Sequence, residues 1–248
     1  MKLQNKLIFA VAATVLAGTA SAGSFDFRHE WKDKSETQAS RVKVGDSWKP
    51  FADHKNVSVY GGLEMKFAGQ DDSKNDFFGN WALTETELDM GVKYTMGKWY
   101  FQPGMPIAMT ASRTVYKPQF RVGYKSDFGL KTALRYRFEY RDQIDGVTTT
   151  NMDGDALNNY TQGKLTLTGG YGFKSIPGFE LSYEANYVQS YDNIRLANND
   201  DWEWDAGVIA GYKMGNWKPY AEVWTVDGTS SKTDERQMRY RLGIKYYY

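Results

Sequence analysis

The chain contains no cysteine and only two histidines in its 248 residues. Without cysteine, no disulfide can cross-link the fold, even in an oxidising compartment. A metal site would have to be built from carboxylates or from the two histidines. The composition therefore implies neither a disulfide framework nor a cofactor.

Long apolar runs are also missing. One short run, Leu7 to Leu16, follows two lysines and precedes a small-residue Ala-Ser-Ala site, a pattern typical of a secretory signal peptide. This run is shorter than the roughly 20 apolar residues that a transmembrane helix needs, and no later segment approaches that length. The sequence predicts a signal peptide over residues 1–22, an exported domain over residues 23–248, and no helical membrane anchor.

Mean hydropathy and net charge carry little information by themselves. The mean hydropathy of −0.62 would ordinarily indicate a water-soluble protein, yet aromatic residues make up 16% of the chain. A membrane β-barrel exposes only alternate residues to lipid, so a low mean is expected of it. Lys and Arg (31) almost balance Asp and Glu (30). The placement of charge therefore has to indicate the function.

Alternation of apolar and charged residues is the clearest pattern in the chain. Successive side chains of a β-strand point to opposite faces, so alternation makes one face apolar and the other charged. Between residues 130 and 141, one parity carries Leu130, Leu134, Tyr136, Phe138 and Tyr140, and the other carries Lys131, Arg135, Arg137, Glu139 and Arg141. In an exported chain, this pattern predicts a membrane barrel with a charged lumen.

Alternation between turn signals predicts an all-β fold: a transmembrane antiparallel β-barrel of about 12 strands in the bacterial outer membrane. The predicted strands cover residues 24–33, 38–45, 57–68, 82–95, 98–108, 113–125, 128–142, 157–171, 179–190, 201–213, 217–227 and 236–248. With both termini in the periplasm, long connections at 70–80, 142–156 and 191–200 are extracellular, and most periplasmic turns are short. The connection 46–56 is long for a periplasmic turn, and nothing in the sequence explains it.

If the apolar face of each strand meets lipid, the opposite parity projects into the lumen. Two groups of basic residues then face each other across the barrel. The predicted pore-lining residues are Arg28, Arg41, Lys43, Arg113, Lys117, Arg121, Lys131, Arg135, Arg137, Arg141, Arg239 and Arg241. Carboxylates concentrate on the walls between them, at Glu85, Glu87, Asp89, Glu180, Glu184, Glu203 and Asp205. Two interpretations stay open: the basic residues guide anionic solutes, or ion pairs fill a small barrel.

The expected width of the barrel bears on this choice. Twelve strands that lie about 4.8 Å apart and tilt by about 40° give a backbone radius of roughly 12 Å, which leaves an opening about as wide as one sugar ring. Arginine binds carboxylates in bidentate fashion and stays charged at any relevant pH. Tyr60, Tyr100 and Tyr220 also have inward parity; we interpret them as part of an aromatic belt rather than as a stacking track for sugars.

Four segments resemble the oligogalacturonate-specific porin family (KdgM type), which includes sialic-acid channels. They are Phe25–Glu30, Leu134–Arg137, Asn216–Val223 and Thr233–Arg241, the last being the most specific. The resemblance implies a monomeric outer-membrane channel of twelve strands for acidic oligosaccharides, with inward basic tracks that include Arg28, Arg135, Arg137, Arg239 and Arg241. Where this family usually ends in phenylalanine, the chain ends in Tyr248, a difference that concerns the efficiency of membrane insertion.

The main alternative function is an outer-membrane barrel enzyme, a lipase or protease-like hydrolase. Nucleophilic hydrolysis by serine needs a base beside the nucleophile. The parity of His29 points it outward near the loop end, and His54 falls in a periplasmic connection. Neither histidine suits an extracellular active site, so we expect no enzyme.

A third possibility is an adhesive barrel that uses acidic loops. The loop carboxylates are Asp71, Asp72, Asp76, Asp153 and Asp155, and calcium bridging between them stays open. The arginines alternate with lipid-facing residues instead of forming an exposed basic patch, so the sequence predicts no nucleic-acid partner.

Overall fold

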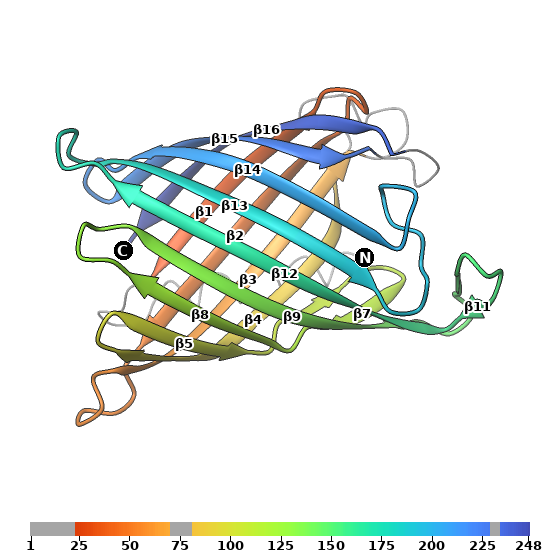
Figure 1. The fold of residues 1–248 in the computed structure, drawn as a ribbon, viewed down its shortest axis with the longest axis horizontal. Coiled ribbons are helices and arrows are strands. Elements are labelled where there is room, and N and C mark those ends of the chain that lie inside the picture. The colour runs from red at the N-terminus through yellow and green to blue at the C-terminus, as the bar shows by residue number, and fades with distance from the viewer. Residues whose placement is uncertain (1–22, 70–80, 229–233) are drawn as a thin grey trace.

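Hydrogen bonding between the first and last strands closes the sheet of this chain into a β-barrel (Figure 1). The structure is a computed structural model that describes residues 23–69, 81–228 and 234–248. The predicted signal peptide (1–22) and the predicted connection 70–80 lie outside these residues. No helix within the described ranges is long and apolar enough to cross a membrane.

Among the described residues, the barrel sheet contains fourteen strands, and two further strands form a separate hairpin. The barrel strands are β1 (Ser24–Lys32), β2 (Gln38–Trp48), β3 (Val57–Gly69), β4 (Trp81–Met96), β5 (Trp99–Gly104), β6 (Ile107–Met109), β7 (Arg113–Tyr116), β8 (Gln119–Lys125), β9 (Lys131–Gln143), β12 (Asn159–Gly172), β13 (Phe179–Ser190), β14 (Trp202–Tyr212), β15 (Trp217–Asp227) and β16 (Arg236–Tyr247). The hairpin consists of β10 (Thr149–Thr150) and β11 (Ala156–Leu157).

Two of the spans are interrupted by proline. β5 and β6 are separated at Pro106, and β7 and β8 at Pro118. Proline cannot donate a backbone hydrogen bond, so it breaks a strand locally. The proline carbonyls still accept, from Lys117 N at 2.9 Å and from Phe138 N at 3.0 Å. Because each pair forms one span, the fourteen strands make the twelve predicted crossings.

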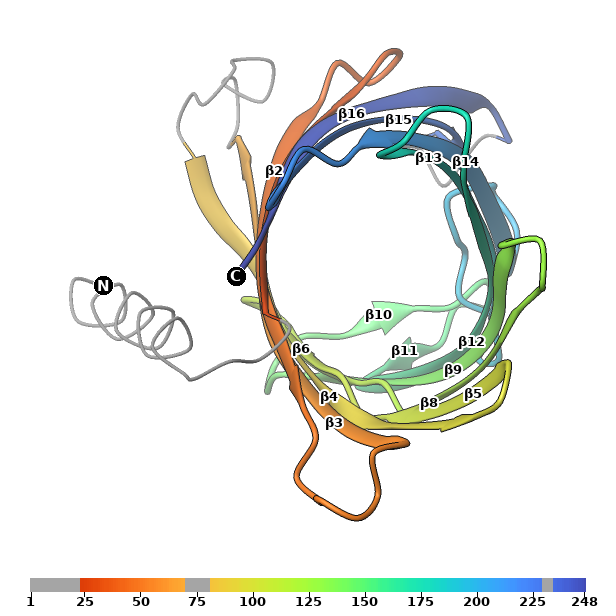
Figure 2. The same ribbon diagram turned by 90° about the vertical axis from the view of Figure 1, so that its left-hand side faces the viewer.

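Antiparallel pairing continues around the whole ring (Figure 2). The ladder between β1 and β16 runs from Ser24 opposite Tyr247 to Lys32 opposite Arg239. The other junction of the sheet, between β9 and β12, is paired from Asn159 opposite Asp142 to Gly170 opposite Lys131. A closed ladder leaves no strand edge unpaired, which a lipid environment requires.

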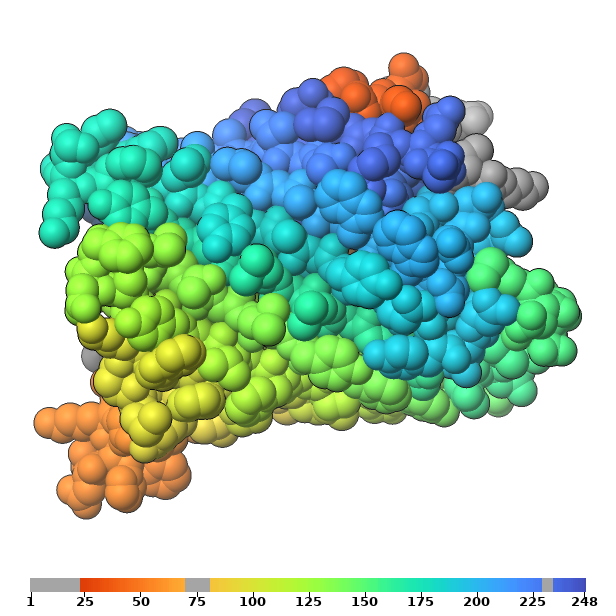
Figure 3. Space-filling model, in the orientation of Figure 1, coloured from red at the N-terminus to blue at the C-terminus, as the bar shows by residue number. Residues whose placement is uncertain are grey.

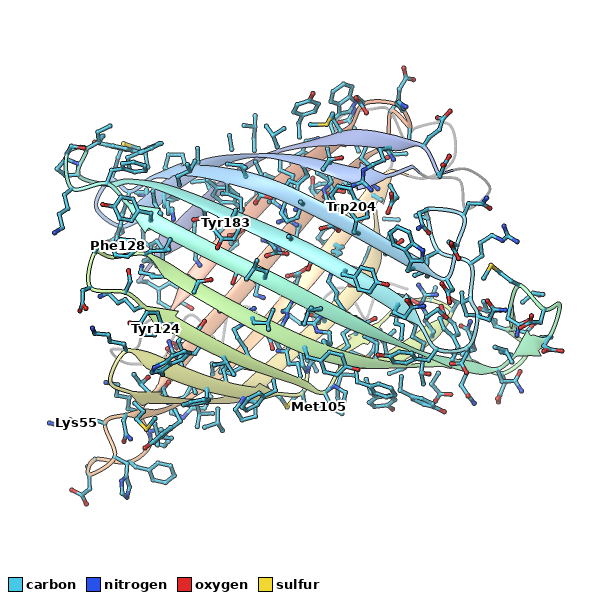
Figure 4. The ribbon with its side chains drawn as sticks, viewed as in Figure 1. Lys55, Met105, Tyr124, Phe128, Tyr183 and Trp204 are labelled. Atoms are coloured by element: carbon cyan, nitrogen blue, oxygen red, sulfur yellow. The ribbon has the colours of Figure 1, made fainter. Side chains whose placement is uncertain are left out.

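The predicted alternation is confirmed by the exposure of the side chains. Leu134, Tyr136 and Leu242 are 48%, 47% and 70% exposed on the outer wall, whereas Glu139 in the same ladder is only 4% exposed. Figure 3 shows side chains covering this outer wall, and Tyr183 and Trp204 project outward from β13 and β14 in Figure 4.

Aromatic pairs mark both ends of the outer wall. Near the short turns, the ring centroids of Trp99 and Tyr124 are 4.7 Å apart and those of Trp217 and Tyr246 are 4.6 Å apart. Towards the long loops, Trp31 stacks on Tyr240 at 5.7 Å. Such aromatic girdles sit at the two membrane–water interfaces of outer-membrane barrels.

The connections follow the predicted asymmetry of long extracellular loops and short periplasmic turns. In the extracellular segment 144–158, Met152 N donates to Asn193 O of the next loop at 2.9 Å. Figure 2 shows the hairpin of this segment, β10 and β11, within the outline of the ring. Two predicted boundaries are off by three residues: β9 begins at Lys131 rather than at residue 128, and β2 continues to Trp48 rather than ending at residue 45, so the long periplasmic connection is 49–56.

A charge on the outer wall should oppose insertion. Leu242 lies in the middle of β16 and is the most exposed of the large apolar side chains on the outer wall. We expect Leu242→Arg to lower the free energy of unfolding in liposomes by about 2–4 kcal/mol, because arginine on the lipid face is costly near the bilayer midplane. Urea titration with gel-shift detection of the folded barrel measures this loss. Leu242→Val is the control and should stay close to the parent protein.

Candidate functional site

The strand register places one parity of every span inside the barrel, and these residues form the candidate site. A cavity of about 420 Å³ lies in this lumen. Its walls come from β1, β2, β3 and β12 to β16. Its charged lining residues are Arg28, Glu30, Arg41, Glu64, Lys66, Lys164, Glu184, Asp205, Glu222, Arg239 and Arg241.

Glu222 is the centre of an ion-pair network across β15, β16 and β1. Its carboxylate lies 3.0 Å from Arg241 Nη1 and 3.5 Å from Arg28 Nη1. It also accepts a hydrogen bond from the Trp224 indole at 2.7 Å. Arg241 extends the network to Glu30 at 2.9 Å. Because these side chains are largely withdrawn from water, the pairs hold the wall more firmly than exposed ion pairs would.

A second network crosses β1 to β4. Arg41 lies 3.2 Å from Asp26 and 3.3 Å from Glu64. Glu64 also lies 3.7 Å from both Lys43 and Lys66. The chain of charges continues to the next strand, where Lys66 pairs with Glu85 at 2.6 Å.

A third network joins the opposite side of the barrel. Lys117, at the proline break between β7 and β8, lies 2.6 Å from Glu87 on β4. On β9, Glu139 pairs with Arg141 at 2.7 Å and accepts a hydrogen bond from Gln162 at 3.0 Å. Basic and acidic side chains are therefore neighbours on this side of the barrel too.

The wall formed by β8 and β9 contains arginines without carboxylate partners. Arg121 stands opposite Arg135 in the ladder, and Arg135 donates to the hydroxyl of Thr166 at 3.0 Å. Among the described residues, no carboxylate lies within 4.0 Å of either guanidinium. Arg137 donates to Gln119 at 2.8 Å and reaches Glu139 only at 4.0 Å. This strip presents unneutralised positive charge to the lumen.

Three inward tyrosines correct one interpretation. Tyr60 lies against Gly91 and Gly104, Tyr100 against Gly123, and Tyr220 against Gly243, all on the lumen side. Glycine lets these rings approach the backbone closely, and the Tyr220 hydroxyl donates to Asp26 at 2.8 Å. Their assignment to the aromatic belt was wrong: they line the inner wall, and glycines opposite them make room for the rings.

The register places eleven of the twelve predicted pore-lining residues at inward positions, and Lys117, which lies between β7 and β8, pairs with the inward Glu87. Within the described chain, seven take part in ion pairs: Arg28, Arg41, Lys43, Lys117, Arg137, Arg141 and Arg241. The others, which form no such pair with a described residue, are Arg113, Arg121, Lys131, Arg135 and Arg239. Arg113 donates to the Tyr160 hydroxyl at 3.1 Å, and the Arg239 guanidinium lies 4.7 Å from the Trp224 ring. The part of all twelve residues in conduction stays a prediction.

Several inward residues were missed by the sequence analysis. Asp26, Glu30, Glu64, Glu222 and Lys164 all contribute to the lumen. The signal was available, because Asp26 and Glu30 share the parity of Arg28 along β1.

Both histidines lie where the sequence predicted them to be. His29 points outward and its Nδ1 lies 2.7 Å from Ser40 Oγ, with Gln38 3.0 Å from Nε2. This Ser–His contact was not foreseen, but Ser40 is only 3% exposed and cannot receive a substrate. His54 lies in the periplasmic connection, where its ring contacts Phe51 edge-on. Within the described ranges, no group of three or more metal-ligating side chains is present.

Comparison with known proteins places this architecture among outer-membrane channels. Residues 16–248 match the family described as oligogalacturonate-specific porin protein (KdgM). The oligogalacturonate-specific porin KdgM of Dickeya dadantii (strain 3937) is 28% identical over 98% of this chain and 99% of its own length. The solved NanC porin has a TM-score of 0.72 at 16% identity, covering 90% of this chain and 98% of that one. A solved KdgM porin in complex with disordered oligogalacturonate has a TM-score of 0.59 at 22% identity, covering 91% and 99%.

Removing the charge of Glu222 should shift the ion preference of the pore. Arg28 would then have no carboxylate partner among the described residues, and Arg241 would keep only Glu30. At about 8 Å in water one unit charge contributes roughly 0.5 kcal/mol, with opposite signs for an anion and a cation, so we expect Glu222→Gln to raise the anion-to-cation permeability ratio roughly fivefold. The zero-current potential of single channels under a KCl gradient measures this ratio.

The matched control is Asp53→Asn, which removes the same charge from an exposed residue of the 49–56 connection. It should leave the ratio unchanged. An unchanged ratio in Glu222→Gln, or a lower one, would contradict the expected electrostatic effect of this carboxylate on permeating ions.

Proposed function

Because the chain belongs to the oligogalacturonate-specific porin family, we propose that it carries acidic oligosaccharides, oligogalacturonates or similar oligouronates, across the outer membrane into the periplasm. Passage is facilitated diffusion down a gradient and uses no nucleotide or cofactor. The protein is an outer-membrane porin, and members of this family are channels rather than enzymes. The hydrolase alternative is therefore set aside.

The observation that carries the proposal is the strip of unneutralised arginine on β8 and β9. Arg121 and Arg135 have no carboxylate partner among the described residues, and Arg137 is held mainly by the neutral side chain of Gln119. A guanidinium without an intramolecular carboxylate can bind the carboxylate of a solute directly. On the opposite wall, Arg28 and Arg241 are already engaged by Glu222. We therefore assign the main solute contacts to β8 and β9.

Repeated weak contacts suit transport better than one tight site. A solute must bind well enough to enter the pore and weakly enough to leave it. The uronate units of an oligomer each carry a carboxylate, so successive units can exchange along Arg121, Arg135 and Arg137. The wall opposite them is formed by the Glu222 network. Its charges are nearly balanced, so it repels the carboxylates of the sugar only weakly.

The relatives support uronates as the solute class. The relative from Dickeya dadantii is named for oligogalacturonate, and a solved KdgM porin was obtained in complex with oligogalacturonate. Another relative, from Escherichia coli O6:H1, is named as an N-acetylneuraminic acid channel and is 21% identical over 92% of this chain. These sugars share a carboxylate on a pyranose ring. The more similar relative favours oligouronates.

A single barrel encloses the proposed pathway entirely. The lumen cavity and the three ion-pair networks all belong to one chain, so a second copy is not required to complete the pore. We propose that the channel acts as a monomer surrounded by outer-membrane lipid.

The charge of the arginine strip can be tested by its effect on solute uptake. We expect Arg121→Gln combined with Arg135→Gln to slow the uptake of trigalacturonate roughly fivefold, since each lost charge contributes about 0.5 kcal/mol at about 8 Å in water. Uptake of the neutral trisaccharide maltotriose should change less than about twofold. Liposome swelling at low ionic strength measures both rates.

The matched control for this test is Lys34→Gln with Lys98→Gln, which removes two positive charges from connections. Both lysines are exposed and form ion pairs there. Equal losses for the charged and the neutral sugar in the arginine variant would contradict an electrostatic mechanism.

Salt provides an independent test on the unmodified channel. The Debye length falls from about 10 Å at 0.1 M to about 3 Å at 1 M salt, so screening weakens lumen charges at high salt. We expect anion preference in planar bilayers at low salt that declines as KCl is raised. Cation preference at low salt, or no conductance at all, would refute the proposed role.

A further inference from the structure

Among the described connections at the periplasmic end of the barrel, 49–56 is the longest, and the channel function does not explain its length. Its sequence is Lys-Pro-Phe-Ala-Asp-His-Lys-Asn, and every one of these residues is exposed. It follows directly on Trp48, the last residue of β2. We call residues 48–56 the interfacial loop.

The interfacial loop lies outside the ring of strands. Figure 1 shows it at the lower left, at the same end as the short turns, and Figure 2, which views that end, shows it standing away from the barrel opening. Lys55 is labelled at its tip in Figure 4, beyond the barrel wall. This position excludes a role in covering the pore and places the loop at the level where the barrel leaves the membrane.

Trp48 joins the loop to the lipid-facing surface. It has outward parity on β2, and its indole lies 4.0 Å from the position of a Cβ at Gly61 on β3. Its side chain is 48% exposed, like the girdle residues Trp99 and Trp217 of the same end, which are 46% and 48% exposed. The aromatic girdle at the periplasmic interface therefore continues into the loop.

Phe51 extends this apolar surface beyond the barrel wall. It is 53% exposed, and its ring contact is with His54 at 6.3 Å. The turn is held by hydrogen bonds from His54 N to Phe51 O at 3.3 Å and from Val57 N to His54 O at 2.9 Å. Exposed aromatic side chains that are held in place and adjoin a lipid-facing surface are typical of membrane contact.

Two lysines flank the aromatic residue. Lys49 and Lys55 are exposed, and neither forms an ion pair with a described residue. Lysine stems cover apolar surface while the ammonium group reaches the polar layer of a bilayer. Basic residues at that level are attracted to anionic phospholipid headgroups.

We propose that the interfacial loop binds phospholipid of the inner leaflet of the outer membrane. Trp48 and Phe51 enter the boundary between headgroups and acyl chains, and Lys49 and Lys55 contact headgroup phosphates. The loop thereby anchors one side of the barrel at the periplasmic interface, independently of any solute in the lumen.

Because the chain has no cysteine, a single introduced cysteine reports on the loop without background. Ala52→Cys, labelled with an environment-sensitive fluorophore, is reconstituted into vesicles of phosphatidylethanolamine and phosphatidylglycerol. Asp155→Cys in the extracellular loop is the matched control, since that residue is also exposed. Quenching by acyl-chain-brominated phospholipid and by aqueous iodide is measured for both labels.

We expect brominated lipid to quench the label at residue 52 at least about twofold more than the label at residue 155, and iodide to show the reverse order. Adding Trp48→Ser and Phe51→Ser should bring residue 52 to the level of residue 155. If iodide quenches the label at residue 52 freely and brominated lipid does not quench it, the loop lies in water and the proposal is overturned. The same result would be expected of a loop that contacts a soluble protein instead of lipid. Heat-dependent gel mobility confirms that each variant is a folded barrel.

The lysines have their own test. Quenching by brominated lipid at residue 52 should decrease when phosphatidylcholine replaces phosphatidylglycerol, and Lys49→Gln with Lys55→Gln should remove this dependence. Asp53→Asn, which alters charge in the same loop without removing a lysine, should retain it. Equal quenching in both lipid mixtures for the parent chain would refute the headgroup contact.

Discussion

The structure depends on the requirement that a sheet in lipid must close on itself. Because β1 pairs with β16, the backbone groups at the edges of both terminal strands are hydrogen-bonded, and neither edge needs water as a partner. Once the ring is closed, each strand has one face towards lipid and one towards the interior. Lipid admits apolar residues such as Leu134 and Leu242. Polar side chains of the spans are consequently gathered in the lumen, which explains how a chain with a negative mean hydropathy can form a membrane barrel.

Gathering so many charges in one lumen has structural consequences. Glu222 and Glu64 each lie close to more than one basic group, so the walls around β1 are bound together by shared carboxylates. Inward aromatic residues would narrow the passage, but Tyr220 lies against Gly243 and is held by Asp26. Arg121 and Arg135 differ because neither forms an ion pair with a described carboxylate. A porin lumen can thus combine a neutralised, rigid side with a side whose charge remains available to solutes.

Particular residues show how far sequence analysis reached. The alternation around Arg135 and Arg137 predicted both the strand and the inward direction, because period two is a local property of an extended chain. The extent of β2 was underestimated, since Asp46 and Ser47 resemble turn residues and only pairing with Gly61 and Tyr60 keeps them in the ladder. The inward tyrosines were assigned to a belt because tyrosine is typical of barrel rims, and the glycines that receive them lie on neighbouring strands and give no local signal. Likewise, the Ser40–His29 contact joins two strands and has no signal in either one.

By itself, the sequence determined the number of spans, which side of each strand faces lipid and the inward set of arginines, because alternation and turn residues act within a few positions of one another. Only the tertiary structure decided which charges neutralise each other, which arginines remain unpaired and where the aromatic rings rest. These outcomes depend on the register between neighbouring strands, and register is set by closure of the entire ring rather than by any one segment. The outward position of the 49–56 connection is of the same kind, since it follows from where β2 and β3 leave the barrel.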